Sequence, residues 1–315
     1  MTASLTAVVV SYDSAHALPD CLGALARDGV SAIVVDNAST DGSAEVAARL
    51  GIAVIRNAAN EGYGRANNRG VAAATTPFVL IINPDVILDQ GAVAALLDAA
   101  TRYPDAGLLA PTLIEPDGRI FFQPRSLLAP YLPNPAGTSR IPEGDCCAPF
   151  LSGAVFLMRR DLFLALGGFD ANIFLFYEDD DLCRRIADAG HALVHVAGAV
   201  ARHGRGRSSA PAPGRIFRGR WHQAWSRAYV SRKYGLPNPA PAMALRNALK
   251  AFGAALLFNR GRMARYGGSA AGAIAALRGV DALDYQGILN GRLGEGASRS
   301  GARASTAASG EQEPQ

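Results

Sequence analysis

Three apolar runs decide the fold, and each ends in a polar loop: LTAVVVSYDS at 5–14, AIVVDNASTDG at 32–42 and FVLIINPD at 78–85. A short apolar run bounded by turn-forming residues is typical of a buried β-strand. A fourth, shorter run lies at 53–56, between the second and the third. We therefore expect four strands, at 5–12, 32–36, 53–56 and 78–82.

The segments that follow these strands have the apolar spacing of helices. They lie at 18–25, 43–50, 63–74 and 91–103. Regular alternation of strands and helices predicts an α/β fold with a parallel sheet and helices on both faces. Such sheets bind ligands at the carboxyl ends of their strands, where the polar loops of this chain converge.

The rest of the chain is expected to form two further regions. The predicted elements are strands at 150–158, 193–196 and 200–202, and helices at 179–189, 221–234, 242–265 and 269–277. We predict a catalytic domain at 1–214, a basic helical region at 215–293 and a disordered tail at 294–315, which is small and polar in composition.

Composition narrows the class of protein. The chain has 315 residues, of which 49% are hydrophobic, and a mean hydropathy of +0.10. These values fit a globular protein and argue against a disordered chain or a collagen-like fibre. The four cysteines form no CxxC pair, which argues against a zinc ribbon. The apolar runs fall short of the roughly 20 residues of a spanning helix, and the N-terminus lacks a signal peptide's basic region, so we expect a cytoplasmic protein.

Charge is distributed unevenly along the chain. Residues 1–201 hold 13 Lys and Arg against 22 Asp and Glu, whereas residues 202–303 hold 18 against 3. A basic region of this kind favours an anionic partner, such as a pyrophosphate-bearing substrate or anionic lipid headgroups, or else is a solvated face. We do not expect a nucleic-acid partner, because the arginines form no recognisable reader motif.

Three groups of residues can carry chemistry. Asp85 follows a strand and a proline, which suits a divalent cation that bridges phosphates, although an Asp there can also simply open a helix. Four acids run from Glu178 to Asp181 after an apolar stretch; they are either ordinary first-turn helix residues or include a desolvated general base. His203 lies in a loop of glycines and arginines whose guanidinium groups suit phosphate oxygens.

Together these motifs resemble the inverting nucleotide-sugar glycosyltransferases of family 2, which have the GT-A fold. The resemblance is strongest to the bacterial rhamnosyltransferase-like branch, which builds cell-wall and surface polysaccharides. The matching motifs, in the family's order, are VVVSYDS (8–14), VVDNASTDG (34–42), NEGYGRANNRG (60–70), INPDV (82–86), FLSGAVFLMRRDLF (150–163), GGFDANIFLFYEDDDLCRRI (167–186) and HGRGRS (203–208).

The resemblance implies a role for each site residue. Asp179 would be the catalytic base, with Glu178 beside it, and Asp85 and His203 would hold a divalent cation, Mg²⁺ or Mn²⁺. Gly153 would border the sugar and the acceptor. The other residues implied to bind the nucleotide sugar are Ser11, Asp13, Asp36, Arg65, Asn67 and Asn83. Asn83 departs from the family's DxD motif, and Asp13 stands where the family often has Asn.

The resemblance also implies the partners. The donor would be a nucleotide-diphosphate sugar, dTDP-rhamnose before UDP-galactofuranose or UDP-GlcNAc, and the acceptor a saccharide or a polyprenyl-linked saccharide. A non-catalytic relative that binds nucleotide sugar or glycan is the alternative. Basic and apolar residues at 245–265, with Trp221 and Trp225 four apart, suit peripheral docking on the anionic inner face of the plasma membrane; packing against the catalytic domain explains them equally well.

Overall fold

The computed structural model describes residues 4–123, 126–129, 142–209, 212 and 214–289, so the predicted tail lies outside the described residues. Its centre is one mixed sheet in the order β3-β2-β1-β4-β9-β6-β10-β5, with β7 added to β6 and β8 to β10. The strands are β1 (Leu5–Ser11), β2 (Ser31–Asp36), β3 (Ala53–Arg56), β4 (Phe78–Ile82), β5 (Val86–Leu88), β6 (Ala106–Ile114), β7 (Ile120–Phe121), β8 (Cys146–Cys147), β9 (Val155–Arg159) and β10 (Ala192–His203).

Helices cover both faces of this sheet, as predicted. They are α1 (Leu18–Arg27), α2 (Ser43–Arg49), α3 (Tyr63–Ala73), α4 (Ala92–Arg102), α5 (Arg160–Ala165) and α6 (Glu178–Asp188). Successive side chains of β1 belong to two different cores: Val9 packs with α1 and α4, whereas Val8 and Val10 pack with α3, α5 and α6. Alternation across the pleat explains why β1 is apolar at nearly every position.

The predicted parallel half of the sheet is confirmed, and the other half is mixed. β1 pairs in parallel with β2 and β4, whereas β9 runs antiparallel to β4 and β5 runs antiparallel to β10. β6 was not predicted, because Gly107 and Pro111 weaken the signal of a strand. The two short strands predicted at 193–202 are one strand, whose register shifts between Val196 and Val200.

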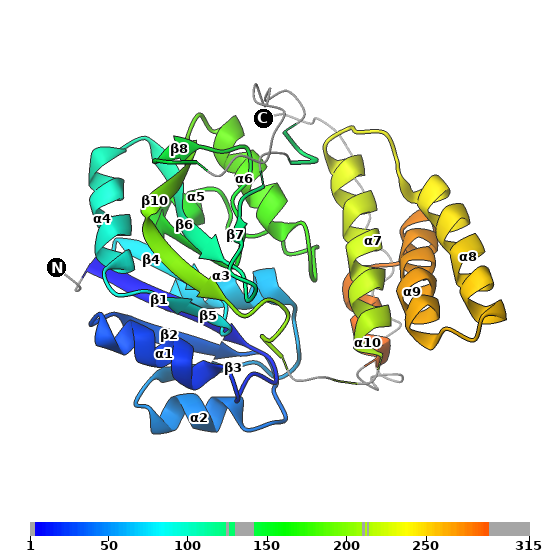
Figure 1. Cartoon of the computed structure of the whole chain (residues 1–315), viewed down its shortest axis with the longest axis horizontal. Helices are drawn as coiled ribbons and strands as arrows, with labels where there is room; N and C mark the ends of the chain where they lie inside the picture. The colour runs from blue at the N-terminus through cyan, green and yellow to red at the C-terminus, as the bar shows by residue number, and fades with distance from the viewer. Residues whose placement is uncertain (1–3, 124–125, 130–141, 210–211, 213, 290–315) are drawn as a thin grey trace, which may run out of the picture.

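Four further helices follow the sheet: α7 (Arg215–Lys233), α8 (Ala240–Leu256), α9 (Arg260–Leu277) and α10 (Ala282–Leu289). In Figure 1, α7 stands next to the sheet domain and α8 lies on the outer side, with α9 packed against both. The backbones of α7 and α9 lie in close contact, since a Cβ on Gly272 would lie 2.1 Å from the carbonyl oxygen of Trp221. Among the described residues, no helix combines the length and the apolarity that crossing a membrane requires.

The single helix predicted at 242–265 is wrong. The chain breaks at Phe258, which has a left-handed φ of 52°, and a new helix begins at Arg260. Asn259 caps this helix, because its side chain accepts a hydrogen bond from the main-chain N–H of Arg262. The continuous apolar pattern concealed this break.

Candidate active site

The ends of β1 and β2 place two buried polar side chains next to each other. Ser11 pairs with Asp36 in the parallel register, and both are almost completely buried. Neither Ser11 Oγ nor Asp36 Oδ1 has a hydrogen-bond partner among the described residues. A buried polar atom without a partner is costly, so this edge is suited to a ligand that supplies hydrogen-bond donors.

Polar side chains hold the surrounding loops in place. Asp13 adopts a left-handed φ of 50°, and its Oδ1 accepts a hydrogen bond from the main-chain N–H of Thr40 at 2.8 Å. Asn37 donates through Nδ2 to Asn60 Oδ1 at 2.8 Å and accepts at Oδ1 from the main-chain N–H of Glu61 at 3.0 Å. Asn37 was not among the predicted site residues, because its only signal is its position directly after a buried strand.

Helix α3 carries two of the residues predicted to bind the nucleotide sugar, Asn67 and Arg65, and their surroundings differ. Asn67 is fully buried, donates through Nδ2 to the carbonyl of Tyr63 at 3.0 Å, and leaves Oδ1 without a partner among the described residues. Arg65 donates from Nε to the carbonyl of Ala171 at 2.7 Å, so it ties α3 to the segment before α6.

Asp85 and His203 lie together although 117 residues separate them in the chain. The antiparallel pairing of β5 with β10 sets His203 opposite Val86, and His203 Nε2 lies 3.8 Å from Asp85 Oδ1. The loop after His203 then folds over Asp85: Ser208 Oγ donates to Oδ1 at 2.8 Å, and the main-chain N–H of Arg207 donates to Oδ2 at 3.2 Å. Asp85 is consequently buried and held in one orientation.

The side chains at this place could hold a divalent cation through a small number of protein ligands. Asp85 offers a carboxylate, His203 an imidazole, and Asn83 an amide Oδ1 that is buried and unpartnered among the described residues. No cluster of three or more His, Cys, Asp or Glu with metal-binding geometry exists in the described part of the chain. Cations that bind phosphates commonly take one or two protein ligands and complete their shell with water and substrate oxygens.

The four acids form the first turn of α6, where the helix dipole favours negative charge. Asp179 accepts hydrogen bonds from the main-chain N–H groups of Gly153 and Asp180, both at 3.0 Å. Burial raises the pKa of the Asp179 carboxyl above its ordinary value. Burial, together with the charge of Asp179, raises the pKa of Glu178 well above its ordinary value, and the same two causes raise the pKa of Asp180 to about 7.

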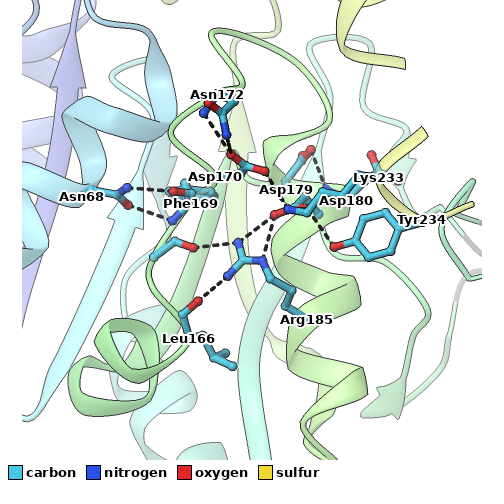
Figure 2. Close-up of polar contacts among 12 residues, drawn as sticks. Asn68, Leu166, Phe169, Asp170, Asn172, Asp179, Asp180, Arg185, Lys233 and Tyr234 are labelled. Carbon is cyan, nitrogen blue, oxygen red and sulfur yellow. Dashed lines mark hydrogen bonds and ion pairs between the residues drawn. The ribbon is translucent and has the colours of Figure 1, made fainter. Parts of the chain in front are cut away.

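Asp181 differs from its three neighbours because cations surround it. Arg185 Nε donates to Asp181 Oδ2 at 2.9 Å, and Lys233 of α7 donates to Asp181 Oδ1 at 2.5 Å and to Asp170 at 2.6 Å. Figure 2 shows how Lys233, Tyr234 and Arg185 converge on this turn of α6. The network fastens α7 to α6, whereas Glu178, Asp179 and Asp180 form no ion pair with the described residues.

The segment that leads into β9 connects the acids with the cation site. The main-chain N–H of Asn83 donates to the carbonyl of Ala154 at 2.8 Å, and the adjacent Gly153 binds Asp179. Tyr63 of α3 donates through its hydroxyl to the carbonyl of Gly153 at 2.7 Å. Residues of the motifs at 60–70, 82–86 and 167–186 therefore contact Gly153 or its neighbour Ala154.

A pocket of about 420 Å³ opens on the acids. Its wall includes the aromatic residues Phe150, Phe176 and Tyr177 and the acids Glu178, Asp179 and Asp180, with Gln123 and Leu127. The remaining two lining residues, Gln223 and Arg227, lie one turn apart on α7. Arg227 Nε has no hydrogen-bond partner among the described residues. This pair was not predicted, since a Gln and an Arg on a basic helix form no recognisable motif.

A second pocket, of about 430 Å³, borders the cation site. Asp85, His203 and Arg207 line it together with His16, Asp20, Glu115 and Arg202. Arg205, which the sequence analysis expected near phosphate, instead forms an ion pair with the buried Glu115 at 2.9 Å.

Comparison with known proteins finds the same family twice. The model of glycosyl transferase family 2 matches residues 6–167, and a second model, glycosyltransferase like family 2, matches residues 142–224.

Two relatives and one solved structure illustrate what the chain is similar to. An N-acetylglucosaminyl-diphospho-decaprenol L-rhamnosyltransferase of Mycobacterium tuberculosis is 33% identical over 72% of this chain and 88% of its own length. A rhamnosyltransferase of Escherichia coli K12 is 26% identical over 56% of this chain and 73% of its own length. A mannosyltransferase of Pyrobaculum calidifontis, solved with GDP-mannose and Mn²⁺, superimposes with a TM-score of 0.54 at 20% identity, covering 87% of each chain.

Proposed function

This chain belongs to glycosyltransferase family 2, and we propose that it transfers rhamnose from dTDP-rhamnose to a polyprenyl-linked saccharide in the synthesis of a cell-envelope polysaccharide. The observation that carries the proposal is the position of Asp179, which lines a pocket and accepts a hydrogen bond from Gly153, the residue before the Ala154 whose carbonyl binds Asn83. The names of two relatives support the choice of rhamnose, and one of those names includes a decaprenol diphosphate.

The donor's nucleotide would bind at the ends of β1 and β2. Ser11 Oγ, Asp36 Oδ1 and Asn67 Oδ1 all lack partners among the described residues, and all three can accept hydrogen bonds. The imide N–H of a thymine or uracil ring and the hydroxyls of the sugar are donors of the required kind. This edge therefore favours a pyrimidine nucleotide, and UDP-galactofuranose or UDP-GlcNAc stays the alternative donor.

Asn83, Asp85 and His203 would hold Mg²⁺ or Mn²⁺ beside the diphosphate. A cation bound there would neutralise the charge that the leaving group develops. Asp85 can serve because Ser208 and Arg207 fix its carboxylate without giving it a positive side-chain partner at hydrogen-bond distance.

Asp179 would act as the general base. It removes a proton from the acceptor hydroxyl, whose oxygen attacks the anomeric carbon on the face opposite the nucleotide diphosphate, and the diphosphate leaves. One displacement inverts the anomeric configuration, so no carboxylate nucleophile is required. The raised pKa of Asp179 makes it a stronger base than an exposed aspartate.

The pocket beside Asp179 would receive the acceptor saccharide. Aromatic faces stack against the apolar side of a sugar ring, whereas amide and charged groups bind its hydroxyls. Because Gln223 and Arg227 come from α7, the region at 215–293 would complete the acceptor site of the catalytic domain at 1–214.

A donor panel tests this proposal. Purified protein with Mn²⁺ is given dTDP-rhamnose, UDP-galactofuranose or UDP-GlcNAc and a polyprenyl-diphosphate GlcNAc acceptor, and product is measured by mass spectrometry. We expect transfer from dTDP-rhamnose, and a rise in melting temperature with dTDP because a ligand of the folded state stabilises it. Transfer from a UDP-sugar alone would show that the donor is that sugar nucleotide and not dTDP-rhamnose. The absence of both transfer and nucleotide binding would refute an enzymatic role.

A further inference from the structure

Helix α8 carries large apolar side chains on the side that faces water. Leu245, Leu249, Phe252 and Leu256 recur at intervals of four, three and four residues, and 63–66% of each is exposed. This spacing places them along one face of the helix. The buried residues of α8 lie on the opposite face: Ala240, Met243, Asn247 and Ala254.

The exposed stripe continues into the turn between α8 and α9. Leu257 is 74% exposed and Phe258 is 90% exposed, which makes Phe258 the most exposed large apolar residue of the described chain. The left-handed backbone of Phe258 lets the chain turn here, and such a conformation is unusual for a bulky residue. A continuous apolar surface of this kind marks a place of interaction rather than ordinary surface variation.

Charge identifies the occupant. Residues 240–266 hold five basic residues and no Asp or Glu, and all five are exposed: Arg246, Lys250, Arg260, Arg262 and Arg265. An apolar stripe with exclusively positive neighbours fits the boundary between the headgroups and acyl chains of an anionic bilayer. A second copy of this chain would bring the same positive charges together, which disfavours self-association.

We propose that the stripe from Leu245 to Phe258 inserts into anionic lipid, with the basic residues of α8 and α9 contacting the headgroups. Trp221 and Trp225, considered as anchors from the sequence, are buried and cannot serve. Figure 1 shows α8 on the outer side of the helical layer, with α7 between it and the sheet domain. The surface is therefore separate from the acids of the active site. Lipid binding itself does not depend on the proposed function; only its purpose does, which is to bring the enzyme to a membrane-anchored acceptor.

Sedimentation with vesicles tests the proposal without donor, acceptor or metal. The full chain is mixed with neutral phosphatidylcholine vesicles or with vesicles that contain about 30% phosphatidylglycerol. We expect binding to the anionic vesicles only. The variant Phe252→Ser/Phe258→Ser should bind roughly tenfold more weakly or worse, since each loses a large apolar group. The variant Arg260→Gln/Arg262→Gln should bind the anionic vesicles more weakly, by roughly fivefold for each charge removed.

Matched controls keep the test decisive. Leu50→Ser removes another exposed leucine, 51% accessible, from the end of α2 and should bind as the unmodified chain does. The melting temperature and its shift with dTDP should be unchanged in the Phe252→Ser/Phe258→Ser variant, because both side chains are exposed. Equal binding to neutral and anionic vesicles, or no loss in either double variant, overturns the proposal. A dimer that the Phe252→Ser/Phe258→Ser change dissociates, in a chain that ignores vesicles, also overturns it. None of these results depends on whether the proposed transfer occurs.

Discussion

The main-chain N–H of Gly153 donates to Oδ2 of Asp179 at 3.0 Å, and no side chain stands between them. The bond connects the first turn of α6 with the segment that leads into β9, which itself pairs with the strand before Asp85. A carboxylate held by a backbone group stays aligned, because the backbone has less freedom to move than a side chain. We infer that the glycine is required for the position of the proposed base.

Gly153→Ala should lower kcat by roughly tenfold or more. An added Cβ would lie 3.0 Å from the Cβ of Asp179 and 3.3 Å from its Oδ2, so the carboxylate has to shift, and small misplacements of a reacting group are costly. Steady-state kinetics with dTDP-rhamnose measures the effect. Gly23→Ala is the control: its Cβ would meet nothing within 4 Å, so activity should not change. Equal kcat for both variants would contradict the inference about Gly153.

Asp179→Asn should lose transfer by about 10²–10⁴-fold, the usual contribution of a general base. The amide keeps the shape of the carboxylate and can still accept from Gly153, so the fold and the thermal shift with dTDP should remain. Asp188→Asn, at the far end of the same helix, removes only an ion pair with Arg184 and should behave as the unmodified enzyme does. Turnover by Asp179→Asn close to the original rate would show that another group is the base.

The pKa of Asp180, raised to about 7, predicts how stability depends on pH. Because the folded state holds this proton more tightly than the unfolded chain does, the contribution to the free energy of unfolding is fully present below about pH 4 and is lost as pH rises towards 7. Asp180→Asn cannot ionise and keeps an oxygen for the hydroxyl of Ser126, which donates to Asp180 at 2.8 Å. Urea unfolding should therefore show a smaller loss of stability between about pH 4 and about pH 7 than in the unmodified chain. An equal loss of stability over this pH range in both proteins would mean that the pKa of Asp180 is not raised.

The parallel half of the fold was predictable because its signals are local. The runs at 5–11 and 78–82 are apolar at almost every position, as strands covered on both faces must be. β6 was missed, since its Gly107 and Pro111 are residues that strands usually avoid, and the pairing of Pro111 with Val196 of β10 is a long-range contact. The break between α8 and α9 at Phe258 was also missed, because a phenylalanine carries no turn signal.

The site could be predicted only in part for a similar reason. The loops after β1, β2 and β4 are visible as polar residues behind apolar runs, which locates Asp36 and Asp85. The pairing of β5 with β10, which brings His203 to Asp85, is a long-range contact between short strands and leaves no local pattern. The resemblance to a family supplied His203 and Asp179, and nothing in the sequence marked Arg227.

Removal of the divalent cation should abolish transfer and leave the fold intact. EDTA should stop the reaction and Mn²⁺ should restore it, whereas the melting temperature without nucleotide should hardly move, because Asp85 is already bonded to Ser208 and Arg207. His203→Ala should weaken Mn²⁺ binding in the presence of dTDP by about tenfold or more, measured by electron paramagnetic resonance, since loss of a direct ligand costs no less than loss of an outer-shell partner. Asp89→Asn changes a partly exposed acid paired with Arg202 and should leave Mn²⁺ binding unchanged. Full activity in EDTA would exclude a required cation.

Arg227→Met should separate acceptor binding from donor binding. The guanidinium is the only cationic group among the described residues that line the pocket next to Asp179, and its Nε is free of hydrogen bonds there. Hydrogen bonds to a charged group contribute about 1.5–3 kcal/mol, so KM for the acceptor should rise roughly tenfold or more while KM for dTDP-rhamnose stays constant. Arg232→Met changes an exposed arginine on the same helix outside the pocket and should alter neither value. If KM for the donor rises instead, the acceptor does not bind at α7, and the region at 215–293 does not have the role proposed for it.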